Sequence, residues 1–136
     1  MVVAGLTEEI VRFQGAASDG ELADIAALFD TIKEQIENNP ILLYMKGSPN
    51  QPQCGFSART VQALMACGER FAYVDILSNP DIRANLPGYA NWPTFPQLWV
   101  NGELIGGCDI VTEMFENGEL QSLIKEAAAA AAQQAG

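Results

Sequence analysis

The chain contains the sequence ILLYM at residues 41–45 and, after a loop, the sequence CGFS at residues 54–57. The apolar run at 41–45 predicts a buried strand, and the residues from Ala58 to Cys67 predict a helix. Cys54 would therefore lie at the first turn of that helix, next to unpaired backbone N–H groups and the positive end of the helix dipole. Such an environment favours the thiolate, which is the form that acts as nucleophile and metal ligand.

The CGFS motif carries one thiol, because Ser57 stands where a second cysteine would complete a C-x-x-C redox pair. The whole chain has 3 cysteines and no histidine. The lack of histidine removes the Cys–His catalytic pair and most zinc sites. A single copy of the chain therefore cannot build a closed four-ligand zinc or iron–sulfur site.

The acidic balance of the chain limits its partners, since 17 acidic and 7 basic residues give a formal net charge of −10. Such a surface repels phosphate backbones and anionic lipids, so we expect neither nucleic-acid nor membrane binding. No apolar run approaches the length of a membrane span, and the N-terminus lacks the basic region of a signal peptide. Without a disulfide framework, the expected compartment is the reducing cytoplasm. Because basic residues are scarce, Lys46, between the strand and the CGFS motif, is a functional candidate.

Hydrophobic periodicity and turn residues predict the remaining elements. Helices are expected from Glu21 to about Asn38, over 55–67, after a cap at Ser78 or Asn79, after a cap at Asp109, and from Glu119 onward. Strands are expected over 41–45, 71–76, 95–100 and 103–106, with a hairpin turn at Asn101-Gly102. Residues 46–53 are expected to form a loop, and residues 86–88 to weaken the helix that contains them.

This order of elements predicts an α/β fold with a mixed four-stranded sheet. The crossover helix over 55–67 implies a parallel pair of strands, and the hairpin implies an antiparallel pair. Helices on both faces complete the architecture. We divide the chain into an N-terminal extension (1–24) with a short helix around Thr7 to Phe13, a central domain (25–128) and an Ala-rich tail (129–136).

Four motifs in this order resemble the thioredoxin fold and, within it, the monothiol, CGFS-type glutaredoxins, close to their single-domain bacterial form. The motifs are KGSP at 46–49, CGFS at 54–57, WPTFPQ at 92–97 and GGCD at 106–109. The resemblance runs from about Asp30 to Lys125. Residues 1 to about 24 lie outside it.

The resemblance implies that the protein binds glutathione, an anionic peptide. Cys54 would be the reactive thiolate and the cluster ligand, with Phe56 beside it in the ligand-binding set. Lys46 and Arg83 would meet a glutathione carboxylate, and Lys46 would also favour the thiolate.

The same resemblance assigns two further segments to the ligand. Phe95 would offer backbone hydrogen bonds to the cysteinyl part of glutathione, ahead of a cis-proline at Pro96. The turn at Cys108 and Asp109 would hold the γ-glutamyl end.

The first function implied is the binding and transfer of a [2Fe-2S] cluster in iron–sulfur protein biogenesis. One thiolate per chain cannot supply four ligands, so a homodimer would bridge the cluster with two Cys54 thiolates and two glutathiones. BolA-type proteins and iron–sulfur acceptor proteins would be the partners. The alternative is a glutathione-dependent monothiol oxidoreductase that acts on protein–glutathione mixed disulfides, of weak activity because the loop before Cys54 is long. A third possibility is a redox-inert binding module that interacts through its N-terminal extension.

Several residues also have plain structural interpretations. Cys67 is better read as a small buried hydrophobe than as a reactive thiol. Cys108 is either a passive turn residue or a resolving thiol for Cys54. Arg83 could instead pair with Asp81. Trp92 could instead be a core residue.

Overall fold

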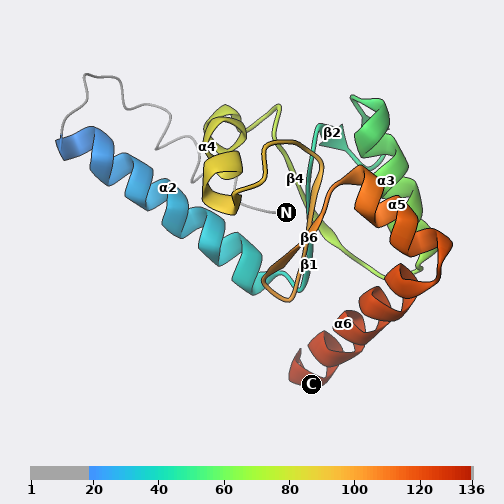
Figure 1. Ribbon diagram of the computed structural model, residues 1–136. Coiled ribbons are helices and arrows are strands. Elements are labelled where there is room, and N and C mark those ends of the chain that lie inside the picture. Colours follow the sequence, from blue (N-terminus) through green and yellow to red (C-terminus); the bar gives the residue numbers. More distant parts are fainter. Residues whose placement is uncertain (1–18, 136) are drawn as a thin grey trace.

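A four-stranded mixed sheet lies at the centre of the computed structural model, which describes residues 19–135 (Figure 1). The elements in chain order are α2 (Asp19–Asn38), β1 (Ile41–Met45), β2 (Gly47–Ser48), β3 (Gln51–Pro52), α3 (Gly55–Ala66), β4 (Ala72–Asp75), α4 (Pro80–Ala90), β5 (Gln97–Val100), β6 (Glu103–Gly106), α5 (Cys108–Glu116) and α6 (Glu119–Ala135). The strand order is β4-β1-β5-β6. Strand β1 pairs with β4 in parallel and with β5 antiparallel, so the predicted mixed sheet is confirmed.

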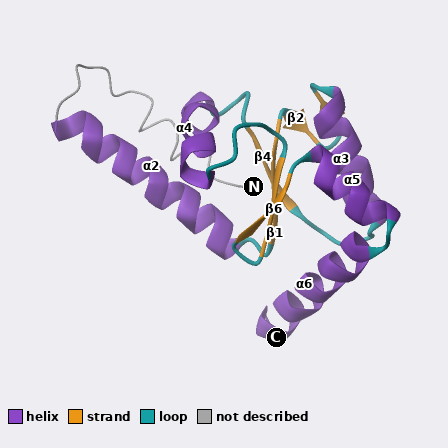
Figure 2. Cartoon of the chain, in the orientation of Figure 1, coloured by secondary structure: helices purple, strands orange, loops and turns teal. Residues whose placement is uncertain are grey.

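Helices cover both faces of the sheet, as Figures 1 and 2 show, with α2 and α4 on one side and α3, α5 and α6 on the other. Alternate residues of β1 point to the two sides, so all five of its residues are buried. Ile41, Leu43 and Met45 join the core under α3, α5 and α6. Leu42 and Tyr44 join the core under α2 and α4.

The turns that place the site follow the local sequence. At the β5–β6 hairpin, Asn101 and Gly102 have φ angles of 52° and 83°, which is the geometry that Asn-Gly adopts most readily in two-residue turns. Helix α3 ends with Cys67 as its cap, followed by Gly68 at φ 80°. Both were expected from the sequence.

Two local expectations were wrong. Part of the expected loop at 46–53 forms a small antiparallel pair, because β2 and β3 fold back on one another. Asp109 is not the N-cap of α5: the helix begins one residue earlier, with Gly107 as its N-cap, and Asp109 lies in the first helical turn. The residues expected to weaken α4 do not end it, because the helix continues through Pro87 to Ala90, where Asn91 in the left-handed conformation closes it.

Helices α2 and α6 lie at the two predicted boundaries, at residues 24 and 128. Helix α2 is continuous from Asp19 to Asn38, so it runs across the boundary placed at residue 24, while the short helix expected at residues 7–13 lies outside the described residues. At the other end, Leu120, Ile124 and Ala127 of α6 are buried, whereas Ala129 and Ala130 are exposed. Within residues 19–135, none of the helices has the length and apolar character needed to cross a membrane.

Candidate functional site

Cys54 caps the N-terminal end of α3, as its position in the sequence predicts. Its backbone is extended, with φ −153° and ψ 154°, and its sulfur accepts a hydrogen bond from the backbone N–H of Ser57 at 3.3 Å. The sulfur therefore takes the role that a serine or aspartate oxygen usually plays at this helix position. The helix start holds the thiol among backbone donors that favour its negative form.

Ser57 links the thiol to the strand that precedes it. The Ser57 side chain is fully buried, and its hydroxyl oxygen accepts a hydrogen bond from the backbone N–H of Lys46 at 3.1 Å. The same oxygen lies 3.5 Å from Cys54 Sγ. Because the backbone N–H occupies the oxygen as acceptor, the hydroxyl hydrogen is free to point at an ionised sulfur. The residue that replaces a second cysteine thus becomes a hydrogen-bond partner of the first.

These contacts decide the acidity of the thiol. Partial burial raises the pKa of Cys54, but the hydroxyl and N–H of Ser57, the N–H of Phe56 and the charge of Lys46 act in the opposite direction and outweigh it. The pKa of Cys54 is therefore lower than that of an ordinary thiol. At neutral pH a larger share of Cys54 is thiolate than of an unperturbed cysteine.

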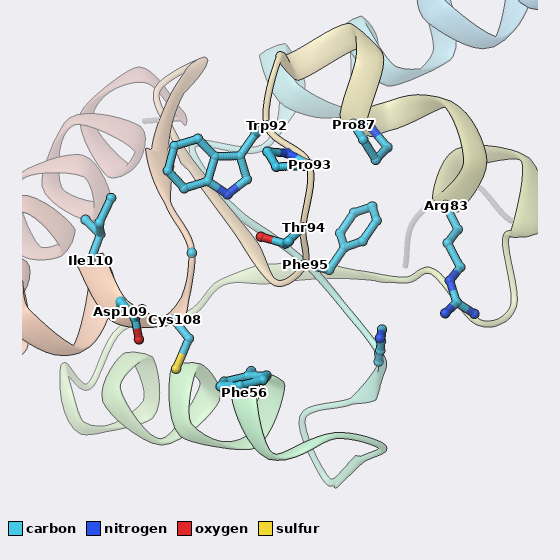
Figure 3. Close-up of a pocket in the computed structure, with 12 residues that line it drawn as sticks. Phe56, Arg83, Pro87, Trp92, Pro93, Thr94, Phe95, Cys108, Asp109 and Ile110 are labelled. Atoms are coloured by element: carbon cyan, nitrogen blue, oxygen red, sulfur yellow. The ribbon is translucent and has the colours of Figure 1, made fainter.

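A cavity of about 690 Å³ lies beside this thiol, between the start of α3, helix α4 and the start of α5 (Figure 3). Six of the predicted site residues line it: Lys46, Phe56, Arg83, Phe95, Cys108 and Asp109. The other two predicted residues adjoin it. Cys54 lies two residues before the lining residue Phe56, and buried Pro96 follows the lining residue Phe95 through a cis peptide bond. The structure therefore brings together residues that are far apart in the sequence.

Two cations stand on the cavity wall, Lys46 after β1 and Arg83 on α4. Figure 3 shows Arg83 extending from α4 along one side of the cavity. Asp81, the alternative partner considered for Arg83, uses Oδ1 to accept the backbone N–H of Ile82 at 3.0 Å. The wall of this strongly acidic chain is thus suited to an anionic ligand.

The loop before β5 is held in place by one buried side chain. Gln97, which is fully buried, donates to the carbonyl oxygens of Trp92 at 3.1 Å and Thr94 at 3.3 Å. Its own oxygen accepts the indole N–H of Trp99 at 3.2 Å. This bonding fixes the loop that forms the far wall of the cavity.

The start of α5 closes the cavity from another side. Gly106 has φ 150°, and a Cβ at Gly107 would lie 3.2 Å from the carbonyl oxygen of Pro96. The lack of a side chain at Gly107 therefore lets the start of α5 approach the backbone at Pro96 closely. Cys108 is buried, with its sulfur 3.9 Å from Thr112 Oγ1, and Figure 3 shows that sulfur directed toward α3 and Phe56.

Sequence reasoning missed half of the lining. Trp92 was expected in the core, but it is only partly buried and lines the cavity together with five others: Pro87, Pro93, Thr94, Gly107 and Ile110. Most of these residues belong to the WPTFPQ and GGCD motifs, so the motifs pointed to these segments but did not assign a role to each residue in them. Cys67 packs against the core beneath α3 and is half-buried, which agrees with its structural interpretation.

No cluster of three or more His, Cys, Asp or Glu side chains that could hold a metal occurs in the described part of the chain. All three cysteines are free. Chemically, the site offers one activated thiol, two cations and the N–H groups at the starts of two helices. This combination suits a small anionic molecule that reacts or coordinates through sulfur.

Comparison with known proteins agrees with this description. The sequence pattern of the Glutaredoxin family matches residues 41–105. Glutaredoxin 4 of Escherichia coli (strain K12) is 73% identical over 105 residues, covering 77% of this chain and 91% of the relative. Glutaredoxin 4 of Pasteurella multocida (strain Pm70) is 70% identical over 100 residues, covering 74% and 92%. The solution structure of reduced apo GrxS14 from poplar is 43% identical with a TM-score of 0.65, covering 75% of this chain and 94% of that one.

A mixed sheet with one activated thiol at a helix start and a cis-proline just before β5 defines a thiol protein of the thioredoxin fold. The high identity over nearly the whole length of the relatives is more specific. The chain belongs to the glutaredoxin family, and its CGFS motif with a single thiol places it in the monothiol branch, close to the single-domain bacterial form. The family resemblance drawn from the sequence is therefore confirmed.

Proposed function

We propose that this protein binds a [2Fe-2S] cluster together with glutathione and passes the cluster to acceptor proteins. The observation that carries the proposal is the activated Cys54 thiol with Ser57 in place of a second cysteine. No internal disulfide within the motif can compete for this sulfur. Thiolate is also the form in which cysteine binds iron.

The cavity supports glutathione as the second component. Glutathione is a small anionic peptide, and the cavity of about 690 Å³ has the size of a small-molecule site. Lys46 and Arg83 would bind one carboxylate. The backbone N–H groups at the start of α5, at Cys108 and Asp109, would bind the γ-glutamyl carboxylate. The backbone of Phe95 would pair with the cysteinyl part.

The donor set then requires two copies. A [2Fe-2S] cluster takes four ligands, and one chain supplies one suitable thiolate, so two Cys54 thiolates and two glutathione thiolates complete the set. Phe56, two residues after Cys54, is 59% exposed, so a second copy or a partner that approaches Cys54 would contact it. We propose a homodimer when the cluster is bound, with BolA-type and iron–sulfur acceptor proteins as partners. The free thiols suit a reducing compartment, for which we propose the cytoplasm.

Anaerobic reconstitution with iron, sulfide and glutathione tests this function. We expect visible sulfide-to-iron absorption in a dimer on a sizing column, and no absorption when glutathione is omitted or in Cys54→Ser. Cys67→Ser is the matched control, because it removes a thiol at the other end of the same helix. A colourless monomer under all conditions would contradict the cluster function.

The alternative function is reduction of protein–glutathione mixed disulfides, favoured by the same lowered pKa. The Cys54 thiolate would attack the glutathionyl sulfur, forming a Cys54–glutathione disulfide and releasing the protein thiolate. A second glutathione thiolate would then attack that glutathionyl sulfur, releasing Cys54 and glutathione disulfide. A colourless monomer that still turns over a glutathionylated substrate would favour this function. Loss of turnover in Cys108→Ser, with cluster binding retained, would make Cys108 a resolving thiol.

A further inference from the structure

Asp75 makes a long-range contact with the loop that precedes the thiol. It is the last residue of β4, paired with Met45 at the end of β1. Beyond this pair the ladder continues only through the N–H of Ile76, which donates to the carbonyl oxygen of Met45 at 2.9 Å. The Asp75 carboxylate then accepts the N–H of Gly47, two residues beyond Met45, at 2.9 Å. A side chain thus takes over where backbone pairing ends.

Gly47 is a position where the backbone has little freedom. Its φ is 91°, and a Cβ there would lie 2.5 Å from the carbonyl oxygen of Gln51. Gly47 begins β2, which pairs with β3 across a turn at residues 49–50. The N–H of Gly47 needs an acceptor, and Asp75 supplies it.

Lys46 is consequently held from both sides. Its N–H donates to Ser57 Oγ at 3.1 Å, and its carbonyl oxygen accepts the N–H of Gln53 at 2.8 Å. The peptide that follows it is fixed by the Asp75 contact at Gly47. A lysine side chain is long and flexible, so the direction of its backbone decides which region its ammonium group reaches.

We propose that Asp75 is a positioning residue for the candidate site: its carboxylate fixes the backbone at Gly47, and this directs the ammonium group of Lys46. The ammonium group then serves the Cys54 thiolate and the carboxylate of the bound anion. The effect on anion binding rests on the proposed function, because the anion is glutathione. The effect on the Cys54 thiolate does not depend on it.

Asp75 also has a purely local role. Its Oδ1 accepts the N–H of Leu77 at 2.9 Å, and its Oδ2 accepts the hydroxyl of Ser78 at 3.1 Å. These bonds shape the turn before α4 and do not touch the site. The two roles can be separated, because Ser78→Ala removes a local bond only, whereas Asp75→Ala also frees Gly47.

A double-mutant cycle between Asp75 and Lys46 is the test. The readouts are the pH profile of Cys54 alkylation by iodoacetamide, followed on the Cys54 peptide, and binding of S-methylglutathione, a non-reacting form of glutathione. We expect Asp75→Ala to slow alkylation at neutral pH by roughly two- to fivefold and to weaken S-methylglutathione binding by roughly two- to tenfold, since a freed side chain must be ordered on binding. Asp75→Asn keeps an acceptor oxygen for Gly47 and should remain close to wild type, as should Ser78→Ala.

Lys46→Gln removes the charge and leaves the backbone amide in place. If Asp75 acts through Lys46, the double variant Asp75→Ala/Lys46→Gln should alkylate no more slowly than Lys46→Gln alone. If the two substitutions slow Cys54 alkylation independently, so that their effects multiply in the double variant, the proposal is overturned. An Asp75→Ala protein that loses thermal stability but keeps the pH profile of Cys54 alkylation would also overturn it. Should Asp75→Ala fail to fold, Asp75→Glu, which lengthens the arm, replaces it in the cycle. Failure of wild type to bind S-methylglutathione would count against the proposed function, while the alkylation cycle would still decide the role of Asp75.

Discussion

Helix α3 carries a cysteine at each end, and the two thiols differ in their contacts with the helix backbone. At the N-terminal end, Cys54 Sγ accepts the N–H of Ser57. At the C-terminal end, Cys67 Sγ donates to the carbonyl oxygen of Ala63 at 3.3 Å. A contact in which sulfur accepts favours the thiolate, and one in which sulfur donates favours the neutral thiol.

The pKa values of the two thiols move in opposite directions. The pKa of Cys67 is raised, first by burial and then by the charge of Glu69, whereas the pKa of Cys54 is lowered against its own burial. Both thiols are only partly buried, so burial alone does not separate them. Position along one helix, together with the nearest charge, decides which cysteine is reactive.

The largest contrast should come from removing each thiol in turn. Cys54→Ser should abolish cluster binding and thiol exchange completely. Cys67→Ser should retain both and cost about 1 kcal/mol or less in stability, because serine can still donate to Ala63. Reconstitution and thermal unfolding of the two variants measure this contrast. Equal loss in both would show that the two ends of α3 do not differ in function.

Alkylation kinetics should separate the thiols within one molecule. Because the pKa of Cys54 lies below the ordinary thiol value and that of Cys67 above it, we expect Cys54 to react about tenfold faster or more at pH 7. As the pH falls from the ordinary thiol range, Cys54 should stay reactive until its lowered pKa is passed. Cys67 should gain reactivity only at higher pH. Mass spectrometry of the two peptides against pH measures both curves, and coincident curves would contradict the assignment.

Removing the hydrogen bond between Ser57 and Cys54 should reduce the difference in reactivity between Cys54 and Cys67. Ser57→Ala deletes the hydroxyl beside Cys54 Sγ but leaves the backbone N–H, so the pKa of Cys54 should rise and alkylation at pH 7 should slow by roughly two- to fivefold. The N–H of Lys46 also loses its acceptor, at about 1 kcal/mol of stability.

Thr60→Ala is the matched control for Ser57→Ala. Thr60 is likewise fully buried in α3, but its hydroxyl donates to the carbonyl oxygen of Phe56 at 2.9 Å. This variant should lose stability while the pH curve of Cys54 stays in place. A slowing of equal size in both variants would assign the effect to packing rather than to the Ser57 hydroxyl.

The different roles of Cys54 and Cys67 at the two ends of α3 could be predicted from the sequence, because they depend on local sequence patterns. The apolar run at 41–45 and the helical spacing after Cys54 are short-range signals. The Asn101-Gly102 turn likewise dictates its own hairpin. The order of these elements limits the sheet to few topologies.

Contacts between distant residues could not be predicted in the same way. The bond from Gly47 to Asp75 joins residues 28 positions apart, and no periodicity announces it. The two-residue strands β2 and β3 are too short to show alternation. Trp92 faces the cavity because buried Gln97 holds the neighbouring carbonyl groups, and that arrangement exists only after folding.

The smallest expected effect concerns the acidic neighbour of Cys67. Glu69→Gln removes the charge that helps to raise the pKa of Cys67, so Cys67 alkylation should become faster, by less than about twofold because an ion near the surface is screened. Cys54, at the opposite end of α3, should not respond. Salt supplies an independent check, since raising the ionic strength should speed Cys67 alkylation in wild type and have less effect in Glu69→Gln. An unchanged rate for Cys67 at low salt would leave burial as the cause of its weak acidity, and the charge of Lys46 on Cys54 would then be the only electrostatic contribution to the difference between the two ends.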